Sequence, residues 1–177
     1  MIVSTSARRR THAVVESPIG PLTLVASNGR LAGLYMDVRG HEPGQAVLGE
    51  AATLGDDCDP VLALTAGQLS EYFAGSRMSF TVPLELDGTP FQRAVWSGLQ
   101  EIGYGQTLSY GELAKRVGTP GASRAVGLAN GRNPVAIVVP CHRVVGADGS
   151  LTGYGGGLDR KRFLLALEQR VTGQTLS

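Results

Sequence analysis

Short apolar segments separated by turn residues open the chain. Ala13–Glu16, Leu22–Ala26 and Leu31–Met36 have the length and the aliphatic content of β-strands. Asn28-Gly29 joins the second segment to the third, and both residues accept the positive φ angles of a two-residue hairpin turn. The pattern predicts an antiparallel meander over this part of the chain.

The remainder of the first half is less regular. His41–Pro60 is rich in glycine, proline and acidic residues without a clear period, so we expect a loop or a weak helix there. Apolar residues from Leu62 to Phe73 recur at helical spacing and stop before Gly75, and Phe80–Leu86 alternates apolar and polar residues as a strand does. The first half is therefore predicted to be α+β, with a boundary at Asp87-Gly88.

The second half has a helical pattern at both ends. Thr89-Pro90 has the form of an N-cap followed by proline at the first helical position, and apolar residues continue at helical spacing as far as Ile102. Val135–Val139 is expected to run extended into Pro140–Arg143. A last helix is expected to end near Arg170. Its expected N-cap is Asp159, with Leu158 and Phe163 at the positions of a hydrophobic staple.

A pair of short helices is predicted between these segments. Ser109–Glu112 fits a capping box that opens a helix to Val117, and the four residues Gly118–Gly121 lead into a second helix, Ala122–Gly131. Two short helices with such a turn are typical of a helix-turn-helix, and Arg124 lies near the start of the second, where recognition helices contact DNA. An ordinary helix pair in a small bundle is the alternative.

The composition is that of a globular protein. The chain has 177 residues, 42% hydrophobic and 18% charged, which is enough to bury a core in one large or two small domains. Its longest proline-free apolar run is far shorter than the roughly 20 residues of a membrane span, and no secretory signal is recognisable, so we expect no membrane association. Two cysteines cannot form a disulfide framework, which predicts a reducing, cytoplasmic location. We expect residues 1–11 to form a flexible tail.

Charge is distributed unequally along the chain. Residues 1–87 hold 6 Lys+Arg and 10 Asp+Glu, a net charge of −4, whereas residues 88–177 hold 10 and 5, a net charge of +5. A basic half is consistent with a polyanionic partner such as nucleic acid, and also with a solvated surface.

The two cysteines differ in their neighbours. Cys58 lies among Asp56, Asp57 and Asp59, whose carboxylates disfavour a thiolate, whereas Cys141 is followed by His142 and Arg143, two potential cations that favour one. Cys141 is therefore the candidate nucleophile, and a buried structural thiol is the alternative. In an extended chain His142 would point away from Cys141, so a tight turn or a water would have to connect them. Glu168 is the candidate carboxylate to orient the imidazole.

The sequence lacks the motifs of several other kinds of catalytic and binding site. The cysteines and histidines have no metal-ligand spacing, and there is no Walker loop, Gly-x-Ser-x-Gly or His-Glu-x-x-His, so we expect neither a metal nor another cofactor. Gly153–Gly157 is not preceded by the buried strand of a dinucleotide loop. We expect a loop there that lets a flat ligand approach its backbone amides, with a plain linker as the alternative.

These motifs together resemble a known family. Pro140-Cys141-His142-Arg143-Val144, preceded by Asn130–Pro134 and Ser123–Gly127, resembles the O6-alkylguanine-DNA alkyltransferases. The first half resembles the variable ribonuclease-H-like domain of that family loosely, with Ser17–Gly20 as its best landmark. The similarity continues through further segments of the second half: Phe91–Trp96, Tyr104-Gly105, Ser109-Tyr110, Gly153–Leu158 and Leu164–Glu168.

The resemblance implies a fold and a domain organisation. The fold class is α+β, with a small ribonuclease-H-like antiparallel sheet domain over residues 12–87. A mostly helical, winged-helix-like domain with a helix-turn-helix would follow over residues 88–177 and would bind DNA and transfer the alkyl group.

The resemblance also implies roles for individual residues. Cys141 would take the alkyl group from O6 of guanine, His142 would act through a water as the base, Glu168 would orient His142, and Asn133 would brace the turn before the cysteine. Arg124 would enter the base stack where the flipped base left. The other residues expected to contact the base or DNA are Tyr110, Ala125, Gly131, Arg132, Arg143, Val144, Tyr154, Gly155, Gly156 and Lys161.

The function implied is DNA repair by a single-turnover methylated-DNA:protein-cysteine methyltransferase. It would flip O6-alkylguanine, and also O4-alkylthymine, out of double-stranded DNA and retain the alkyl group irreversibly, without a cofactor and as a monomer, with cooperative binding on DNA left open. One alternative is a non-catalytic alkylated-DNA-binding protein, against which Cys141 argues directly. Others are a helix-turn-helix regulator and a cysteine hydrolase, whose only other histidines would be His12 and His41.

Overall fold

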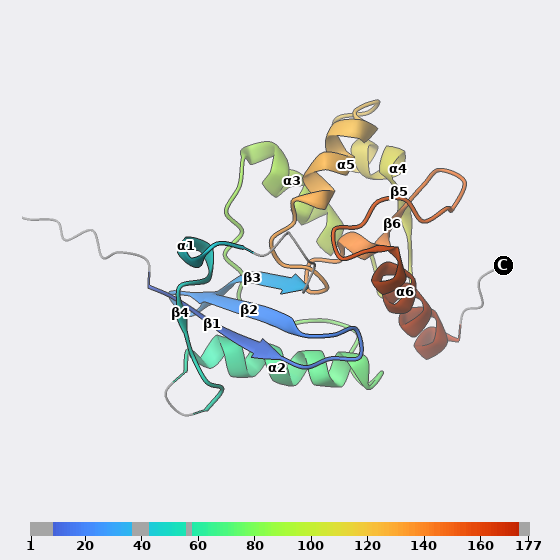
Figure 1. The fold of residues 1–177 in the computed structure, drawn as a ribbon. Helices are drawn as coiled ribbons and strands as arrows, with labels where there is room; N and C mark the ends of the chain where they lie inside the picture. The colour runs from blue at the N-terminus through green and yellow to red at the C-terminus, as the bar shows by residue number, and fades with distance from the viewer. Residues whose placement is uncertain (1–8, 37–42, 56–57, 174–177) are drawn as a thin grey trace, which may run out of the picture.

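A four-stranded sheet forms the centre of the first half. The computed structural model describes residues 9–36, 43–55 and 58–173 (Figure 1). The sheet has the order β3-β2-β1-β4, in which β1, β2 and β3 are antiparallel and β4 pairs in parallel with β1. Its strands and the helices of this half are β1 (Arg10–Val15), β2 (Leu22–Ser27), β3 (Arg30–Met36), β4 (Glu50–Ala51), α1 (Gln45–Leu48) and α2 (Pro60–Phe73).

The second half is mostly helical. A two-stranded parallel sheet, β5-β6, joins the start of the helix pair to the segment after Cys141. In Figure 1, α2 lies on one side of the large sheet, α3, α4 and α5 lie on the opposite side, and α6 lies beside the end of the sheet. The elements are α3 (Pro90–Gln100), β5 (Leu108–Ser109), α4 (Tyr110–Arg116), α5 (Ser123–Gly131), the 3-10 turn η1 (Cys141–Arg143), β6 (Val144–Val145) and α6 (Leu158–Thr172). The predicted α+β class, with a sheet-containing half followed by a mostly helical half, is confirmed.

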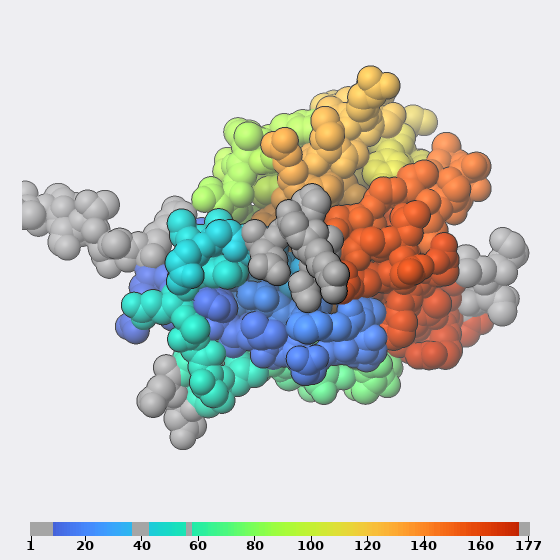
Figure 2. All heavy atoms as spheres, in the orientation of Figure 1, coloured from blue at the N-terminus to red at the C-terminus, as the bar shows by residue number. Residues whose placement is uncertain are grey.

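The two halves share one hydrophobic core. Leu24 of β2, Tyr72 of α2, Trp96 of α3 and Leu164 of α6 all belong to a single cluster of buried side chains. Each such side chain contributes roughly 1.5–3 kcal/mol when fully buried. Figure 2 shows the last part of the chain packed directly against the strands of the first half. The position of the second half is therefore fixed by the first.

Several local predictions are confirmed by backbone geometry. Asn28 and Gly29 have φ angles of 51° and 79°, as the hairpin turn between β2 and β3 requires. Thr89 caps α3 and Ser109 caps α4, each in a complete capping box with the residue three positions later. These caps satisfy amide groups that the first helical turn would leave unpaired.

Two predictions in the first half are wrong, and a third, the loop or weak helix before Pro60, is confirmed only in part. Arg10 and Thr11 are not part of a tail, because the antiparallel register with β2 continues to them, while residues 1–8 lie outside the described residues. The segment before Pro60 contains α1 and the short strand β4, which needs β1 as its partner. Phe80–Leu86 forms no strand and pairs with β3 only through a bridge at Leu84, since Pro83 has no amide to continue the ladder.

Two predictions in the second half are also wrong. Val135–Val139 does not run extended: the Val139 amide donates to the Val135 carbonyl, and Ile137 has a φ of 69°. α6 begins at Leu158 with Gly157 as its N-cap, so Asp159 lies inside the first turn instead of capping it. Within the described ranges, no helix combines the length and the apolarity needed to cross a bilayer.

Candidate active site

Cys141 lies at the wall of a cavity. The side chain is only 6% exposed, and the cavity has a volume of about 680 Å³, within the usual range for pockets that bind small molecules. Both halves of the chain form its walls. They are lined by Leu34, Tyr35 and Met36 of β3, Tyr110 of α4, the end of α5 and the turn after it (Gly127, Asn130–Pro134 and Ala136), Cys141, and Thr152–Gly156.

Asn133 organises the turn that delivers Cys141. Its side-chain amide donates to the carbonyls of Val139 at 2.8 Å and Val135 at 3.4 Å, and its side-chain oxygen accepts from the Val135 amide at 3.0 Å. Asn130 donates to the Cys141 carbonyl at 3.4 Å. These bonds fold the chain back between Asn133 and Pro140, so that the cysteine enters the cavity from a tight turn and not from an extended strand.

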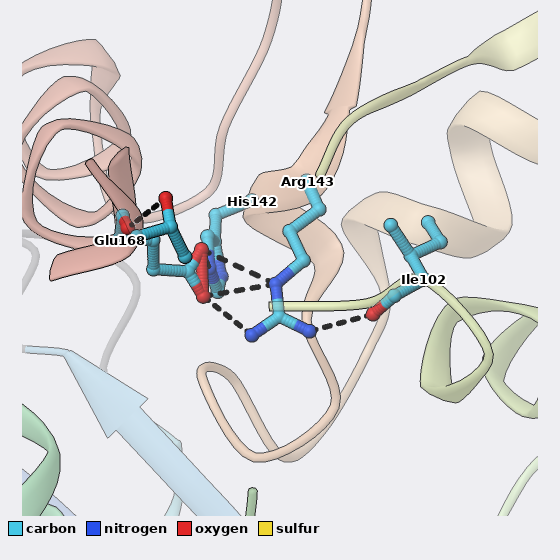
Figure 3. Close-up of polar contacts among 5 residues, drawn as sticks. Ile102, His142, Arg143 and Glu168 are labelled. Carbon is cyan, nitrogen blue, oxygen red and sulfur yellow. Dashed lines mark hydrogen bonds and ion pairs between the residues drawn. The ribbon is translucent and has the colours of Figure 1, made fainter. Parts of the chain in front are cut away.

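Glu168 holds both residues that follow the cysteine. Nε2 of His142 lies 3.1 Å from Oε2 of Glu168, and both side chains are buried. Nε of Arg143 donates to Oε1 of Glu168 at 2.9 Å, its Nη2 donates to the same oxygen, and its Nη1 donates to the Ile102 carbonyl at 2.7 Å (Figure 3). The carboxylate of α6 therefore orients the imidazole and is itself held by the guanidinium.

Burial and these contacts shift the pKa values of His142 and Glu168. Burial lowers the pKa of His142 below its usual value, although Glu168 opposes the shift. Burial alone would raise the pKa of Glu168, but hydrogen bonds and charge from His142 and Arg143 outweigh it and leave the pKa below the usual value. A neutral His142 that donates from Nε2 to the ionised Glu168 keeps a lone pair on Nδ1, and this buried atom has no partner among the described residues. His142 can therefore accept a proton through Nδ1.

The electrostatics of the thiol differ from the sequence-based expectation. Burial raises the pKa of Cys141, while hydrogen bonding involving Asn133 and Tyr154 and the charge of Lys161 act in the opposite direction. The Tyr154 hydroxyl is buried near the sulfur without a hydrogen bond of ordinary geometry. Nε2 of His142 and both Nε and Nη2 of Arg143 engage Glu168. The charge that favours the thiolate comes from Lys161, and not from His142 and Arg143 as the sequence indicates.

Lys161 is buried inside the protein. Its side chain is 0% exposed, and Nζ donates to the carbonyls of Val144 at 2.6 Å and Thr152 at 3.0 Å. Burial lowers the pKa of Lys161, and the neighbouring Cys141 opposes that shift. The sequence analysis does not predict that Lys161 acts on the thiol. The helical spacing could have indicated that Lys161 is buried, because it lies on one face of α6 with Leu164, Leu165 and Glu168.

The residues expected to contact the base or DNA fall into two groups. Tyr110, Tyr154, Gly155 and Gly156 line the cavity with Gly131 and Arg132, while Arg124 and Ala125 are exposed on the first turn of α5. The other group lies in the interior, because Arg143, Val144 and Lys161 are buried and their polar groups are engaged inside the protein. Arg143, Val144 and Lys161 are therefore not surface residues, and the contacts expected of them with the base or DNA stay predictions. Leu128, 65% exposed on α5 one turn after Arg124, is a surface residue that the sequence analysis passed over.

A metal centre has no donor set here. Within residues 9–36, 43–55 and 58–173, no group of three or more His, Cys, Asp or Glu side chains could hold a metal ion.

Asp56 and Asp57, on which the expectation for Cys58 depended, lie outside the described residues.

Comparisons with known families match both halves. The family model described as 6-O-methylguanine DNA methyltransferase, DNA binding domain, matches residues 90–170. The model described as the ribonuclease-like domain of 6-O-methylguanine DNA methyltransferase matches residues 11–86.

Similar proteins and structures carry the same description. A methylated-DNA–protein-cysteine methyltransferase of Mycolicibacterium paratuberculosis is 51% identical over 166 residues, covering 94% of this chain and 96% of the relative. One from Methanosarcina acetivorans is 49% identical over 157 residues, covering 89% and 97%. The crystal structure of Mycobacterium tuberculosis OGT in complex with DNA superposes with a TM-score of 0.81 at 48% identity, covering 91% of this chain and 94% of that one.

Proposed function

This chain belongs to the 6-O-methylguanine DNA methyltransferase family, and from that premise we propose that it repairs DNA by taking the alkyl group of O6-alkylguanine onto Cys141. The observation that carries the proposal is the placement of Cys141 at a cavity of about 680 Å³, followed directly by His142, which Glu168 orients. A nucleophile, a proton acceptor and an orienting carboxylate are the parts that activation of a thiol requires.

The reaction is a transfer between two atoms. The Cys141 proton passes through a water to Nδ1 of His142, the sulfur attacks the alkyl carbon, and a bond from sulfur to carbon forms as the bond from carbon to O6 breaks. The electron pair of the broken bond stays on the guanine, which takes up a proton, so the products are a thioether and an unmodified guanine. Lys161 stabilises the negative charge on sulfur before attack.

The substrate is a base that has left its duplex. Chemistry on O6 requires extrusion of the nucleotide, which costs a few kcal/mol. The cavity offers Tyr110, Tyr154 and the backbone of Gly155 and Gly156 to the extruded base. In this proposal Arg124, exposed near the start of α5, fills the gap in the stack, and Ala125, Gly131 and Arg132, on the same helix or directly after it, contact the DNA around it.

Double-stranded DNA is the proposed partner. The net charge of +5 over residues 88–177 and the crystal structure of the M. tuberculosis relative with DNA support this assignment. O4-alkylthymine is a second proposed substrate, because the cavity walls are formed largely by backbone and apolar groups. Asp87-Gly88 marks the proposed boundary between a supporting and a DNA-binding domain, and we propose that the protein acts as a monomer.

The proposed reaction stops after one turnover. The thioether on Cys141 has no leaving group that water displaces readily, so the alkyl group stays on the sulfur.

Mass spectrometry tests the proposal. After incubation with a duplex that contains O6-methylguanine, the peptide that contains Cys141 should gain one methyl group, and the gain should reach one per protein molecule. Undamaged duplex is the control. Tight binding to the methylated duplex without any methyl gain would instead identify a non-catalytic alkylated-DNA-binding protein.

A further inference from the structure

One wall of the cavity is a loop with little structure of its own. Gly153, Tyr154, Gly155 and Gly156 line the cavity, and this segment belongs to no helix or strand. Gly153 and Gly157 have φ angles of 40° and 91°, values that other residues rarely adopt. A glycine-rich segment loses much conformational freedom when it is ordered, so contacts from outside must hold it in place.

Two cations from the first turn of α6 provide these contacts. Lys161 fixes the beginning of the loop through the Thr152 carbonyl, at 3.0 Å. Arg160 fixes its end, because Nη1 donates to the Gly156 carbonyl at 3.1 Å. The residues that line the cavity are therefore suspended between two charged side chains that are neighbours in the sequence.

Arg160 also reaches the first half of the chain. Its Nε donates to the Ile19 carbonyl at 2.9 Å, across 141 positions of sequence. That carbonyl belongs to a well-defined turn: the Ser17 hydroxyl donates to the Gly20 carbonyl at 2.6 Å and accepts from the Ile19 amide at 3.2 Å. Gly20 has a φ of 101°, which favours glycine, and a Cβ there would lie in ordinary contact with Nη2 of Arg160, at 3.4 Å. This turn is the Ser17–Gly20 landmark of the sequence, to which the reaction itself gives no role.

A second contact brings the loop against the same half. A Cβ placed on Gly156 would lie 2.3 Å from Sδ of Met36, so a larger residue at this position would require the Met36 side chain to shift. Met36 itself lines the cavity. The end of the loop is thus fixed between Met36 on one side and the Arg160 bridge on another.

We propose that Arg160 is a positioning residue, which ties the glycine-rich wall of the cavity to the Ser17–Gly20 turn and so preforms the binding site for the extruded base. The inference rests on the proposed function for the identity of the base. Neither hydrogen bond of Arg160 to the backbone reaches Cys141, His142 or Glu168. Its loss should therefore weaken acceptance of the base, because an unordered wall must be ordered on binding. The thiol should be affected less, because within this wall only Tyr154 acts on Cys141.

Arg160→Met and Arg162→Met make a matched pair in a Cys58→Ser background. Both remove one positive charge from the first two turns of α6, but the guanidinium of Arg162 is on the surface and pairs with Asp159, at 3.0 Å. We expect single-turnover transfer from free O6-methylguanine, measured as a second-order rate constant, to fall about tenfold in Arg160→Met and to stay within twofold of wild type in Arg162→Met. Alkylation of Cys141 by iodoacetamide should fall much less than transfer in Arg160→Met and stay unchanged in Arg162→Met.

Hydrogen exchange gives a readout that does not depend on transfer. The amides of residues 153–157 should exchange at least tenfold faster in Arg160→Met than in Arg162→Met. Arg160→Lys should give an intermediate value, because the single nitrogen of a lysine cannot occupy the separate positions from which Nε and Nη1 of Arg160 donate to the Ile19 and Gly156 carbonyls. Unchanged exchange in Arg160→Met would overturn the inference, as would an equal fall in the rates with O6-methylguanine and with iodoacetamide. If wild-type protein takes up no methyl group, the proposed function fails, whereas faster exchange in Arg160→Met would still support the tie.

Discussion

Nε2 of His142 lies 3.1 Å from Oε2 of Glu168, and both side chains are withdrawn from solvent although 26 positions separate them in the sequence. The contact leaves Nδ1 as the ring nitrogen that can accept a proton. Glu168, on α6, therefore determines which nitrogen of His142 acts as the base. Arg143 holds the other oxygen of the same carboxylate.

Loss of the relay should slow transfer without preventing binding. His142→Ala removes the proton acceptor and Glu168→Gln removes the charge that orients it, so each should lower the single-turnover rate by roughly 10²- to 10⁴-fold, the usual contribution of general base catalysis. The pH dependence of the rate should shift to higher pH in both variants. DNA affinity, measured by fluorescence anisotropy, is the control. An unchanged pH profile in both variants would remove the pair from the mechanism.

The two cysteines should differ completely in function. Cys141→Ser should abolish methyl uptake and leave DNA binding largely intact, whereas Cys58→Ser should change neither, because only Cys141 lines the cavity. Methyl uptake from a labelled duplex measures the first property and anisotropy the second. Loss of transfer in a folded Cys58→Ser protein would contradict the assignment.

Acid should destabilise the protein through His142 before it acts on Glu168. The pKa of His142 is held below 6.5 in the folded state, so the unfolded chain binds more protons below that pH and the free energy of unfolding falls as pH decreases. The slope reaches at most about 1.4 kcal/mol per pH unit for one such group. The depressed pKa of Glu168 adds a further loss below pH 4.5, as the pH falls through its folded value.

Urea denaturation at a series of pH values checks this prediction. Between pH 6.5 and 5, the free energy of unfolding of His142→Gln should depend less steeply on pH than that of the wild type. Parallel curves for the two proteins would show that His142 does not carry the acid sensitivity.

Arg124 should matter only when a duplex must be opened. Transfer from the free base involves no extrusion, so Arg124→Ala should leave that rate nearly unchanged. On double-stranded DNA we expect a loss of about 1–3 kcal/mol in transition-state stabilisation, roughly ten- to hundredfold in rate. Single-turnover rates at saturating DNA exclude the effect of weaker binding. An equal fall on both substrates would mean that Arg124 supports the fold instead.

Asn133→Ala should destabilise the turn before the nucleophile. The substitution removes bonds of 2.8 Å and 3.0 Å to backbone groups of Val139 and Val135, which costs about 1–3 kcal/mol for partners left unpaired in the interior. Denaturation measures the loss. Gln100→Ala, which removes a single longer bond of 3.4 Å from an exposed side chain, should change stability far less. Equal effects of the two substitutions would contradict the bracing role of Asn133.

Features that depend on residues close in sequence could be predicted from the sequence alone. The hairpin at Asn28-Gly29 and the caps at Thr89 and Ser109 are correct because each depends on backbone angles or hydrogen bonds within three positions. The neighbours of Cys141 indicate that it is the candidate nucleophile. The sequence also predicts Glu168 as the carboxylate that orients His142, and the structure brings these two side chains together.

Tertiary structure decided how the charged side chains are used. Arg143 and Lys161 carry the charge of a DNA-binding surface in the sequence, but their partners, Glu168 and the Val144 carbonyl, lie 25 and 17 positions away and draw both side chains inward. Val135–Val139 has the composition of a strand, yet the side chain of Asn133 folds it into a turn. A buried polar group without a hydrogen-bond partner lowers the stability of the fold far more than an exposed one does. Each buried side chain therefore needs a partner, and only the packed structure shows which partner lies within hydrogen-bond distance.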